Sequence, residues 1–189
     1  MNVMKWVLFS VSLFAAVTTS ASELSDKLQS SDHVLLMRHT LAPGVGDPAN
    51  YALSECKSQR NLSAEGRTQA KAVGNWLKKM GVNNAQVYSS AWCRCKDTAG
   101  LLDLGGFTIE PALASFFDEM HNAKQKNQAL EAFIAQQLKV KGDKALILVT
   151  HHVNIYEFMG ENVASGDMVL AKVNAAGKMV SYQRIPRPN

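Results

Sequence analysis

The amino-acid sequence predicts an α/β fold, a three-layer α/β/α sandwich with a mostly parallel central sheet. Short apolar runs alternate along the chain with longer segments in which apolar residues recur at helical spacing. This alternation is typical of strands that helices cover on both faces. The run Ala145–Thr150 has the uninterrupted hydrophobic character of a central, buried strand. Residues 22–189 are enough for one domain with a sizeable core.

Residues 1–21 have the pattern of a secretory signal peptide. Lys5 supplies positive charge, Trp6–Val17 carries no charge, and small residues around Ala21 suit cleavage after that residue. The uncharged stretch of about 12 residues is shorter than the roughly 20 that a membrane-spanning helix needs, although a membrane anchor is the alternative. We expect an exported protein, periplasmic in a bacterium, with no stable membrane anchor after cleavage.

The first predicted strand, His33–Arg38, leads into a long polar loop over residues 40–60. A loop of this length with no period of its own is usually functional or mobile. A helix is predicted over Leu62–Met80, with Ser63 as its N-cap and Gly81 at its end. The remaining predicted elements are a strand Gln86–Ser89, a helix Trp92–Leu102, a strand Phe107–Ile109, an irregular segment Pro111–Asn122, a helix Lys124–Val140, the strand Ala145–Thr150, a helix Val153–Met159, and a terminal hairpin of Met168–Val173 and Lys178–Arg184.

The charge pattern gives no sign of a nucleic-acid partner. The formal net charge is +4 and the basic residues are scattered rather than gathered into a patch. Neither G-x-G-x-x-G nor G-x-x-x-x-G-K-[ST] occurs in the sequence, so a nucleotide-binding loop is not supported. We expect no nucleic-acid partner, and the sequence carries no readable signal for an oligomeric state.

The three cysteines, Cys56, Cys93 and Cys95, suggest one disulfide and one free thiol in an exported protein. A bridge from Cys56 to either of the other two would tie the 40–60 loop to the segment around Arg94. We expect Cys56–Cys95 slightly ahead of Cys56–Cys93, with three reduced, buried cysteines as the alternative. The spacing is wrong for a closed zinc site.

Three predicted strand ends carry basic side chains. Arg38 and His39 follow the first strand, Arg94 lies just beyond the second, and His151 follows the central strand. Ligands of open α/β sheets bind at the carboxyl ends of the strands, where these side chains would meet. Two arginines and two histidines would hold a tetrahedral dianion, with help from the amides of a helix that starts near His152.

At these positions the sequence resembles the histidine phosphatase superfamily, branch 1, in the form of a small exported bacterial member. The matching stretches occur in the family's order and cover nearly all of the mature chain: Leu36–Thr40, Gln59–Ala70, Tyr88–Ala99 and Val149–His152. Each stretch alone is a weak signal, and the four together are a strong one. The resemblance implies a phosphoglycerate mutase-like fold.

The resemblance also implies a role for each matching residue. His39 corresponds to the nucleophile that becomes a phosphohistidine, and Arg38, Arg94 and His151 correspond to the rest of the phosphate pocket. No metal ion and no cofactor are implied. His39 has to attack as neutral imidazole, so its other ring nitrogen should donate a hydrogen bond to a carbonyl, most simply one of the nearby backbone.

The sequence departs from the family's pattern at two places. Thr40 stands where the family usually has Gly, and its hydroxyl would touch phosphate or cap the turn. Ser115 stands where many members have a Glu that serves as the acid. The nearest carboxylates are Asp118 and Glu119, and we expect Asp118 to be the proton donor ahead of Glu119.

Two further residues, Arg60 and His152, are candidates for substrate contact. Arg60 lies in the long loop and could equally be a surface or ion-paired residue. His152 is expected at a helix start, where it offers its backbone amide rather than its ring.

The leading hypothesis is a metal-independent phosphomonoesterase acting on a small phosphorylated substrate. A phosphosugar such as a lipopolysaccharide core heptose phosphate is a candidate, since the chain looks like small bacterial periplasmic members, some of which resemble the lipopolysaccharide core heptose phosphatases. The alternatives are a phosphate-binding protein without turnover, which the change at Ser115 keeps open, and a phosphomutase. A metal hydrolase using His39, His151, His152 and a carboxylate is a fourth reading, but adjacent histidines lack the spacing of helical zinc ligands.

Overall fold

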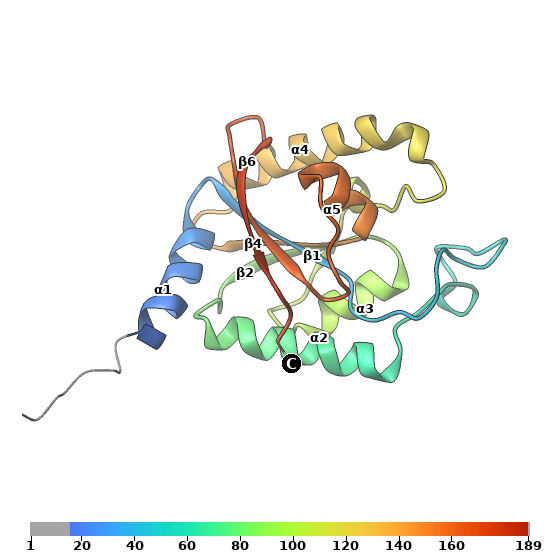
Figure 1. The fold of residues 1–189 in the computed structure, drawn as a ribbon, viewed down its shortest axis with the longest axis horizontal. Coiled ribbons are helices and arrows are strands. Elements are labelled where there is room, and N and C mark those ends of the chain that lie inside the picture. Colours follow the sequence, from blue (N-terminus) through green and yellow to red (C-terminus); the bar gives the residue numbers. More distant parts are fainter. Residues whose placement is uncertain (1–15, 189) are drawn as a thin grey trace, which may run out of the picture.

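A six-stranded sheet forms the middle layer of the protein in a computed structural model, which describes residues 16–188, with side chains from residue 23 onward (Figure 1). Its order is β3-β2-β4-β1-β5-β6. The strands are β1 (His33–Arg38), β2 (Ala85–Ser89), β3 (Thr108–Ile109), β4 (Ala145–Thr150), β5 (Met168–Val173) and β6 (Met179–Ile185). The first four run parallel, whereas β5 pairs antiparallel with both β1 and β6. The sheet is therefore only partly the mostly parallel one expected, because β5 lies antiparallel to β1 and forms the predicted terminal hairpin with β6.

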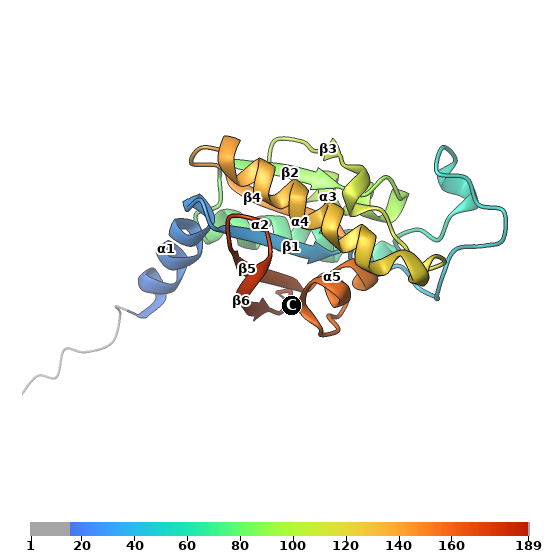
Figure 2. The same cartoon turned by 90° about the horizontal axis from the view of Figure 1, so that it is seen from above.

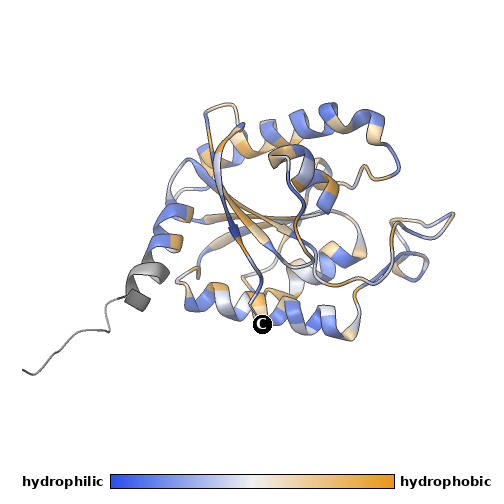
Figure 3. Cartoon of the chain, viewed as in Figure 1, coloured by the Kyte–Doolittle hydropathy of each residue, from blue (hydrophilic) through white to orange (hydrophobic). Residues whose placement is uncertain are grey.

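Helices cover both faces of the sheet, as the three-layer prediction requires (Figures 1 and 2). The elements are α1 (Ala16–Gln29), α2 (Ala64–Lys79), α3 (Cys93–Leu101), α4 (Ala123–Val140) and α5 (His152–Met159), with short 3-10 helices η1 (Cys56–Ser58), η2 (Pro111–Leu113) and η3 (Met120–Asn122). Alternate residues of β1 enter different cores. Leu35 and Met37 pack with α1, α2 and α3, while Val34 and Leu36 pack with α4 and α5. Figure 3 shows this pattern as hydrophobic central strands between helices with hydrophilic outer faces.

The sequence-predicted strands and helices between residues 33 and 185 are all present, with ends that differ by at most two residues. The segment expected to be irregular, 111–122, contains η2 and η3. Helix α1 was not predicted. Its residues Leu24 and Leu28 are buried in the core, so the packed part of the chain begins before the first strand.

The predicted signal peptide, residues 1–21, falls mostly outside the described residues. Only its last part is described, as the first turns of α1. Cleavage after Ala21 therefore stays a prediction. Between residues 16 and 188, none of the helices combines the length and the apolar character needed to cross a bilayer.

The start of α2 is pressed against the chain just after β1. The Ser63 hydroxyl caps the helix by accepting from the Gly66 amide at 3.0 Å. A Cβ on Gly66 would lie 2.1 Å from the carbonyl oxygen of Leu41, so only glycine allows this approach. The Leu-Ser-x-x-Gly pattern thus fixes the backbone two residues beyond His39.

Candidate active site

The carboxyl ends of β1 and β4 lie side by side and bring the predicted basic residues together. Arg38 and Thr150 are register partners, and the amide of His39 donates to the Thr150 carbonyl at 3.0 Å. The rings of His39 and His151 are 5.6 Å apart between centroids. Residues that are more than a hundred positions apart in the sequence thus share one edge of the sheet, because parallel neighbours end at the same edge.

His39 is buried and electrically neutral. Its Nδ1 lies 2.8 Å from the carbonyl oxygen of Thr40, the backbone acceptor expected from the sequence. Burial lowers the pKa of His39 to about 3, and the charges of Arg94, Arg60 and Arg38 act in the same direction, against the hydrogen bond to Thr40. A neutral ring that donates through Nδ1 keeps its lone pair on Nε2.

His151 is held between Arg94 and Ser90. Nδ1 of His151 lies 3.4 Å from a terminal nitrogen of Arg94, and Nε2 lies 2.8 Å from the Ser90 hydroxyl. A guanidinium can only donate, so Nδ1 is the acceptor and Nε2 carries the hydrogen that Ser90 receives. Burial lowers the pKa of His151 well below its usual value, and the charges of Arg94 and Arg60 act in the same direction. Ser90 was not predicted as part of this site.

Two guanidinium groups leave buried donors unused beside these histidines. Within the described part of the chain, the Nε atoms of Arg38 and Arg94 are buried and have no hydrogen-bond partner. The other side of Arg38 is anchored, since its Nη1 donates to the Val163 carbonyl at 2.7 Å. An unsatisfied buried donor costs free energy. The two free Nε atoms are therefore suited to an anion that brings its own acceptors.

The long loop contributes a carboxylate that sequence reasoning missed. Asp47 accepts from Nη1 of Arg94 at 2.8 and 3.0 Å. It also accepts from the Arg60 amide at 2.9 Å and from Nε1 of Trp92 at 3.1 Å. Nothing in the polar 40–60 segment distinguishes Asp47 from its neighbours, because the signal is the fold that brings it to Arg94.

Arg60 is part of this cluster and not a surface residue. Its side chain is half-buried and donates through Nε to the Gly46 carbonyl at 2.6 Å and through Nη1 to the Ala42 carbonyl. Burial, followed by the charge of Arg94, lowers the pKa of Arg60. The residue braces the loop from within while it faces the same cavity as His39.

The disulfide joins Cys56 to Cys93, so the preference for Cys56–Cys95 was wrong. Cys93 begins α3 and faces the loop. Cys95 is two residues further along the helix, which turns its side chain inward, and its Sγ lies 3.5 Å from Nε2 of His151. Burial raises the pKa of the free Cys95 thiol to about 12.

These side chains surround a small cavity of about 20 Å³. Its walls include His39, Arg60, Arg94, His151, His152 and Asp118. Arg38 is not one of the wall residues and acts on the site through its charge and its position beside His39. His152 begins α5, as expected, and is one of the residues that line the cavity.

The two candidate acids are placed differently. Asp118 lines the cavity, whereas Glu119 points to Asn122 at 3.2 Å and to Lys126 at 3.9 Å. Ser115, at the position of the family's usual acid, also lines the cavity. The Thr40 hydroxyl is turned to the hydroxyl of Thr98, 3.2 Å away, and so braces the turn rather than facing the cavity.

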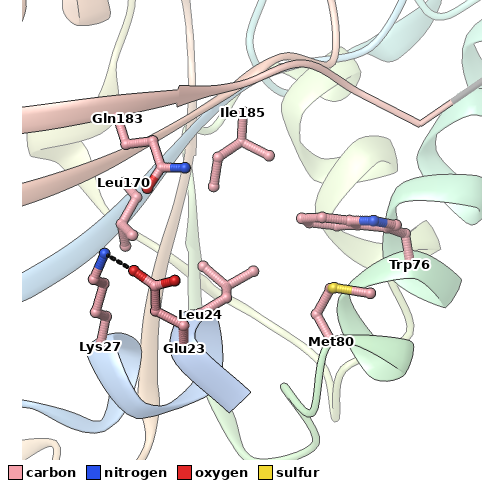
Figure 4. Close-up of a pocket in the computed structure, with 8 residues that line it drawn as sticks. All are labelled: Glu23, Leu24, Lys27, Trp76, Met80, Leu170, Gln183 and Ile185. Atoms are coloured by element: carbon pink, nitrogen blue, oxygen red, sulfur yellow. Dashed lines mark hydrogen bonds and ion pairs between the residues drawn. The ribbon is translucent and has the colours of Figure 1, made fainter. Parts of the chain in front are cut away.

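A larger cavity, of about 100 Å³, lies away from these strand ends (Figure 4). It is bounded by α1, α2 and the β5–β6 hairpin, and Leu24, Trp76 and Met80 supply much of its wall. Its two charged residues, Glu23 and Lys27, are paired with each other at 2.6 Å. Between residues 16 and 188, no group of three or more His, Cys, Asp or Glu side chains is arranged to hold a metal ion.

Solved structures show the same fold at low sequence identity. The protein histidine phosphatase SixA, complexed with tungstate, has 20% identity and a TM-score of 0.52, with 81% of this chain and 94% of that chain covered. A mycobacterial glucosyl-3-phosphoglycerate phosphatase complexed with VO3 has 14% identity and a TM-score of 0.54, with 81% and 97% covered. A phosphoserine phosphatase from Entamoeba histolytica, in complex with 3-phosphoglyceric acid, has 15% identity and a TM-score of 0.53, with 79% and 95% covered.

No curated protein matches the chain in sequence. A family model does match, over residues 34–145, which is more than half of the chain and includes Arg38, His39 and Arg94. His151 lies just beyond the matched stretch, at the end of the strand that completes the cavity. This chain therefore belongs to the histidine phosphatase superfamily, branch 1.

Proposed function

We propose that this protein is a phosphomonoesterase that works through a phosphohistidine at His39 and needs no metal ion. Membership of the superfamily supports a phosphatase. The observation that carries the proposal is the state of His39, a neutral imidazole with Nδ1 committed to a backbone carbonyl and a lone pair on Nε2. That ring forms part of a cavity shared with Arg94 and His151.

The proposed reaction has two displacements at phosphorus. In the first, Nε2 of His39 bonds to phosphorus while the P–O bond to the leaving alcohol breaks, and Asp118 gives the departing oxygen a proton. In the second, water attacks phosphorus, the N–P bond breaks, and Asp118 recovers a proton. The free Nε donor of Arg94 hydrogen-bonds the equatorial oxygens, where charge accumulates in each transition state, and the positive charge of Arg38 beside His39 adds to this stabilisation.

The remaining cavity residues suggest how substrate is held. Arg60 and His152 face the cavity and are available to the phosphate or to the group next to it. The cavity is small, so the leaving group would lie outside it, between the 40–60 loop and the 111–122 segment. A small phosphorylated substrate fits this arrangement. A phosphosugar, such as a lipopolysaccharide core heptose phosphate, is the candidate that agrees with an exported, periplasmic protein.

The direct test is turnover of p-nitrophenyl phosphate between pH 4 and 8, followed by a panel of phosphosugars, nucleotides and phosphopeptides. We expect turnover that EDTA does not affect and vanadate inhibits, and that His39→Ala abolishes. His121→Ala, at an exposed histidine, is the matched control and should keep wild-type activity. Near-native activity of His39→Ala would contradict the proposal.

The outcome also decides the alternatives. Phosphate binding without turnover would favour a binding protein, the reading that Ser115 in place of the usual acid supports. Transfer of the phosphoryl group to a second hydroxyl, in place of release to water, would favour a mutase. Activity that EDTA removes and Zn²⁺ restores would favour a metal hydrolase.

A further inference from the structure

We infer that Asp47 is a positioning residue for catalysis, which holds Arg94 so that its Nε and second terminal nitrogen face the phosphate. The inference rests on the proposed function of the same site. Both carboxylate oxygens of Asp47 accept a hydrogen bond from Nη1 of Arg94, and neither accepts one from its Nε or Nη2. Nη2 remains beside His151, and Nε remains buried without a partner.

The Asp47 carboxylate is buried and held by several hydrogen bonds. Side-chain exposure is 3% for Arg94 and 5% for Asp47, so this ion pair is far less screened than one on the surface. Asp47 is itself fixed by the Arg60 amide and the Trp92 indole. A guanidinium held on one side by a carboxylate has a defined plane, and this fixes the direction of its remaining donors.

Asp47 also offsets a concentration of positive charge. Arg38, Arg60 and Arg94 lie close enough that the charge of Arg94 helps to lower the pKa of each of the other two. Burial acts to raise the pKa of Asp47, but the hydrogen bonds from Arg94 and from the Arg60 amide outweigh it and leave the pKa low. The carboxylate is therefore ionised at neutral pH. It lets three guanidinium groups share a small space before any substrate arrives.

The contacts argue against the opposite role, in which Asp47 would block the site by imitating phosphate. Among the described residues, its carboxylate makes no hydrogen bond to Arg38, His39 or His151. Asp47 lines the same cavity but binds Arg94 through Nη1, and the Nε atoms of both arginines have no hydrogen-bond partner among the described residues.

The chain around Asp47 is fastened to the first turn of α3. Trp92 and Arg94 contact Asp47, while Cys93 between them receives the disulfide from Cys56 and donates its amide to Gln59 at 2.9 Å. Three consecutive residues thus secure the loop to the helix that carries Arg94. This attachment keeps the Asp47 carboxylate in position against the Arg94 guanidinium.

A double-mutant cycle between Asp47 and Arg94 tests the inference. Asp47→Asn is isosteric and removes the charge, and Arg94→Lys keeps the charge and removes the planar fork. We expect Asp47→Asn to lower kcat/KM about 10- to 100-fold in the wild-type background, since misplaced catalytic groups cost rate factors of this size. In the Arg94→Lys background the same change should have less than about a threefold effect, because residues that act as a unit are not additive.

The control is Asp97→Asn, in the same helix as Arg94, which breaks a more exposed ion pair with Arg67 of α2 and should change kcat/KM less than about twofold. Asp47→Ser, a second neutral substitution, is measured in parallel in case the asparagine variant folds poorly. An equal loss in both backgrounds would show a merely structural role and overturn the inference. A gain of activity in Asp47→Asn would show a blocking role and overturn it as well.

Binding of inorganic phosphate, measured by calorimetry over the same cycle, separates this inference from the proposed function. We expect Asp47→Asn to weaken phosphate binding about 10-fold in the wild-type background and less than about threefold beside Arg94→Lys. A wild-type protein that binds phosphate without turnover would contradict the phosphatase proposal, while this binding cycle would still decide the role of Asp47. Turnover and binding that Asp47→Asn leaves unchanged would overturn the inference alone.

Discussion

His39 combines burial with neutrality, and both follow from its contacts. The ring is 1% exposed, has one backbone acceptor at Nδ1, and is flanked by arginines whose charge opposes protonation. A histidine side chain in water has a pKa near 6.5, so at that pH half of the side chains are protonated and cannot act as nucleophiles. The same surroundings that prepare His39 for attack therefore make its protonation incompatible with the folded state.

This has a consequence for stability at acid pH. The pKa of His39 is about 3 in the folded protein and near 6.5 in the unfolded chain, so the unfolded chain binds the extra proton between these values. Stability should be fully present above pH 6.5 and fall as the pH decreases toward 3, with about 2 kcal/mol lost through His39 by pH 5. Urea unfolding of wild type and His39→Gln from pH 8 to pH 4 measures this. The variant should show the shallower decline, and equal slopes would contradict the assigned shift.

The choice of acid can also be made at the residue scale. Asp118 lines the cavity and Glu119 is turned to Asn122, so Asp118→Asn should slow turnover about 100-fold or more for alkyl phosphates, whose leaving groups need a proton. It should slow p-nitrophenyl phosphate much less, because that leaving group departs without one. Glu119→Gln is the matched control. The reverse pattern, with Glu119→Gln the slow variant, would assign the acid to Glu119.

At the scale of elements, the site depends on how the 40–60 loop is joined to α3. The loop has one short 3-10 helix and no strand, so it has few backbone hydrogen bonds of its own. Gln59 and the disulfide supply the attachment instead. The loop can then carry Asp47 and Arg60 to the cavity although it belongs to neither the sheet nor the helical layers.

Loss of the disulfide should destabilise the protein. Cys56 and Cys93 are 37 residues apart, and a cross-link that closes a loop of this size stabilises by about 4 kcal/mol through the unfolded state. Cys56→Ser should lower the free energy of unfolding by about this amount in urea. Cys95→Ser should keep the disulfide, as shown by the absence of reactive thiols in the denatured, unreduced variant. Two reactive thiols in that variant would contradict the Cys56–Cys93 assignment and favour a disulfide between Cys56 and Cys95 in the wild-type protein.

At the scale of the molecule, a buried lysine ties the start of the chain to the region before the central strand. Lys141 is 2% exposed, and its ammonium donates to the carbonyls of Leu28 and Gln29, at the end of α1, and to that of Lys144. The last carbonyls of a helix lack partners within the helix, so this one side chain satisfies acceptors from two distant segments. It holds α1 against the sheet at the end opposite the active site.

Removal of this ammonium should loosen α1. Lys141→Met leaves several buried carbonyls without a donor, and we expect a loss of about 3 kcal/mol in the free energy of unfolding. Lys139→Met, at an exposed position two residues earlier, is the control and should change it by less than about 0.5 kcal/mol. Hydrogen exchange should show faster exchange confined to α1 in Lys141→Met. Unchanged protection of α1 would contradict the role of Lys141.

Much of the fold is local and was predictable on that account. The apolar runs of β1 and β4, the Ser63 cap and the Gly81 end of α2 are signals carried by a few neighbouring residues, and each is found in the structure. Helix α1 was missed because its buried face follows directly on the apolar N-terminal stretch and carries no separate signal. The terminal hairpin was predicted, but the antiparallel pairing of β5 with β1 was not, because strand periodicity is the same for both directions.

The amino-acid sequence alone is enough to predict the α/β layering, the strand ends that carry Arg38, His39 and His151, and the place of Arg94 after the second strand. These are properties of short segments, and parallel strands bring their ends to one edge whatever lies between them. Three features become visible only in the folded molecule: Cys93 pairs with Cys56, Asp118 and not Glu119 lines the cavity, and Asp47 contacts Arg94. Each of these depends on the direction in which a side chain leaves a loop or helix, and that direction is set by packing between segments far apart in the chain.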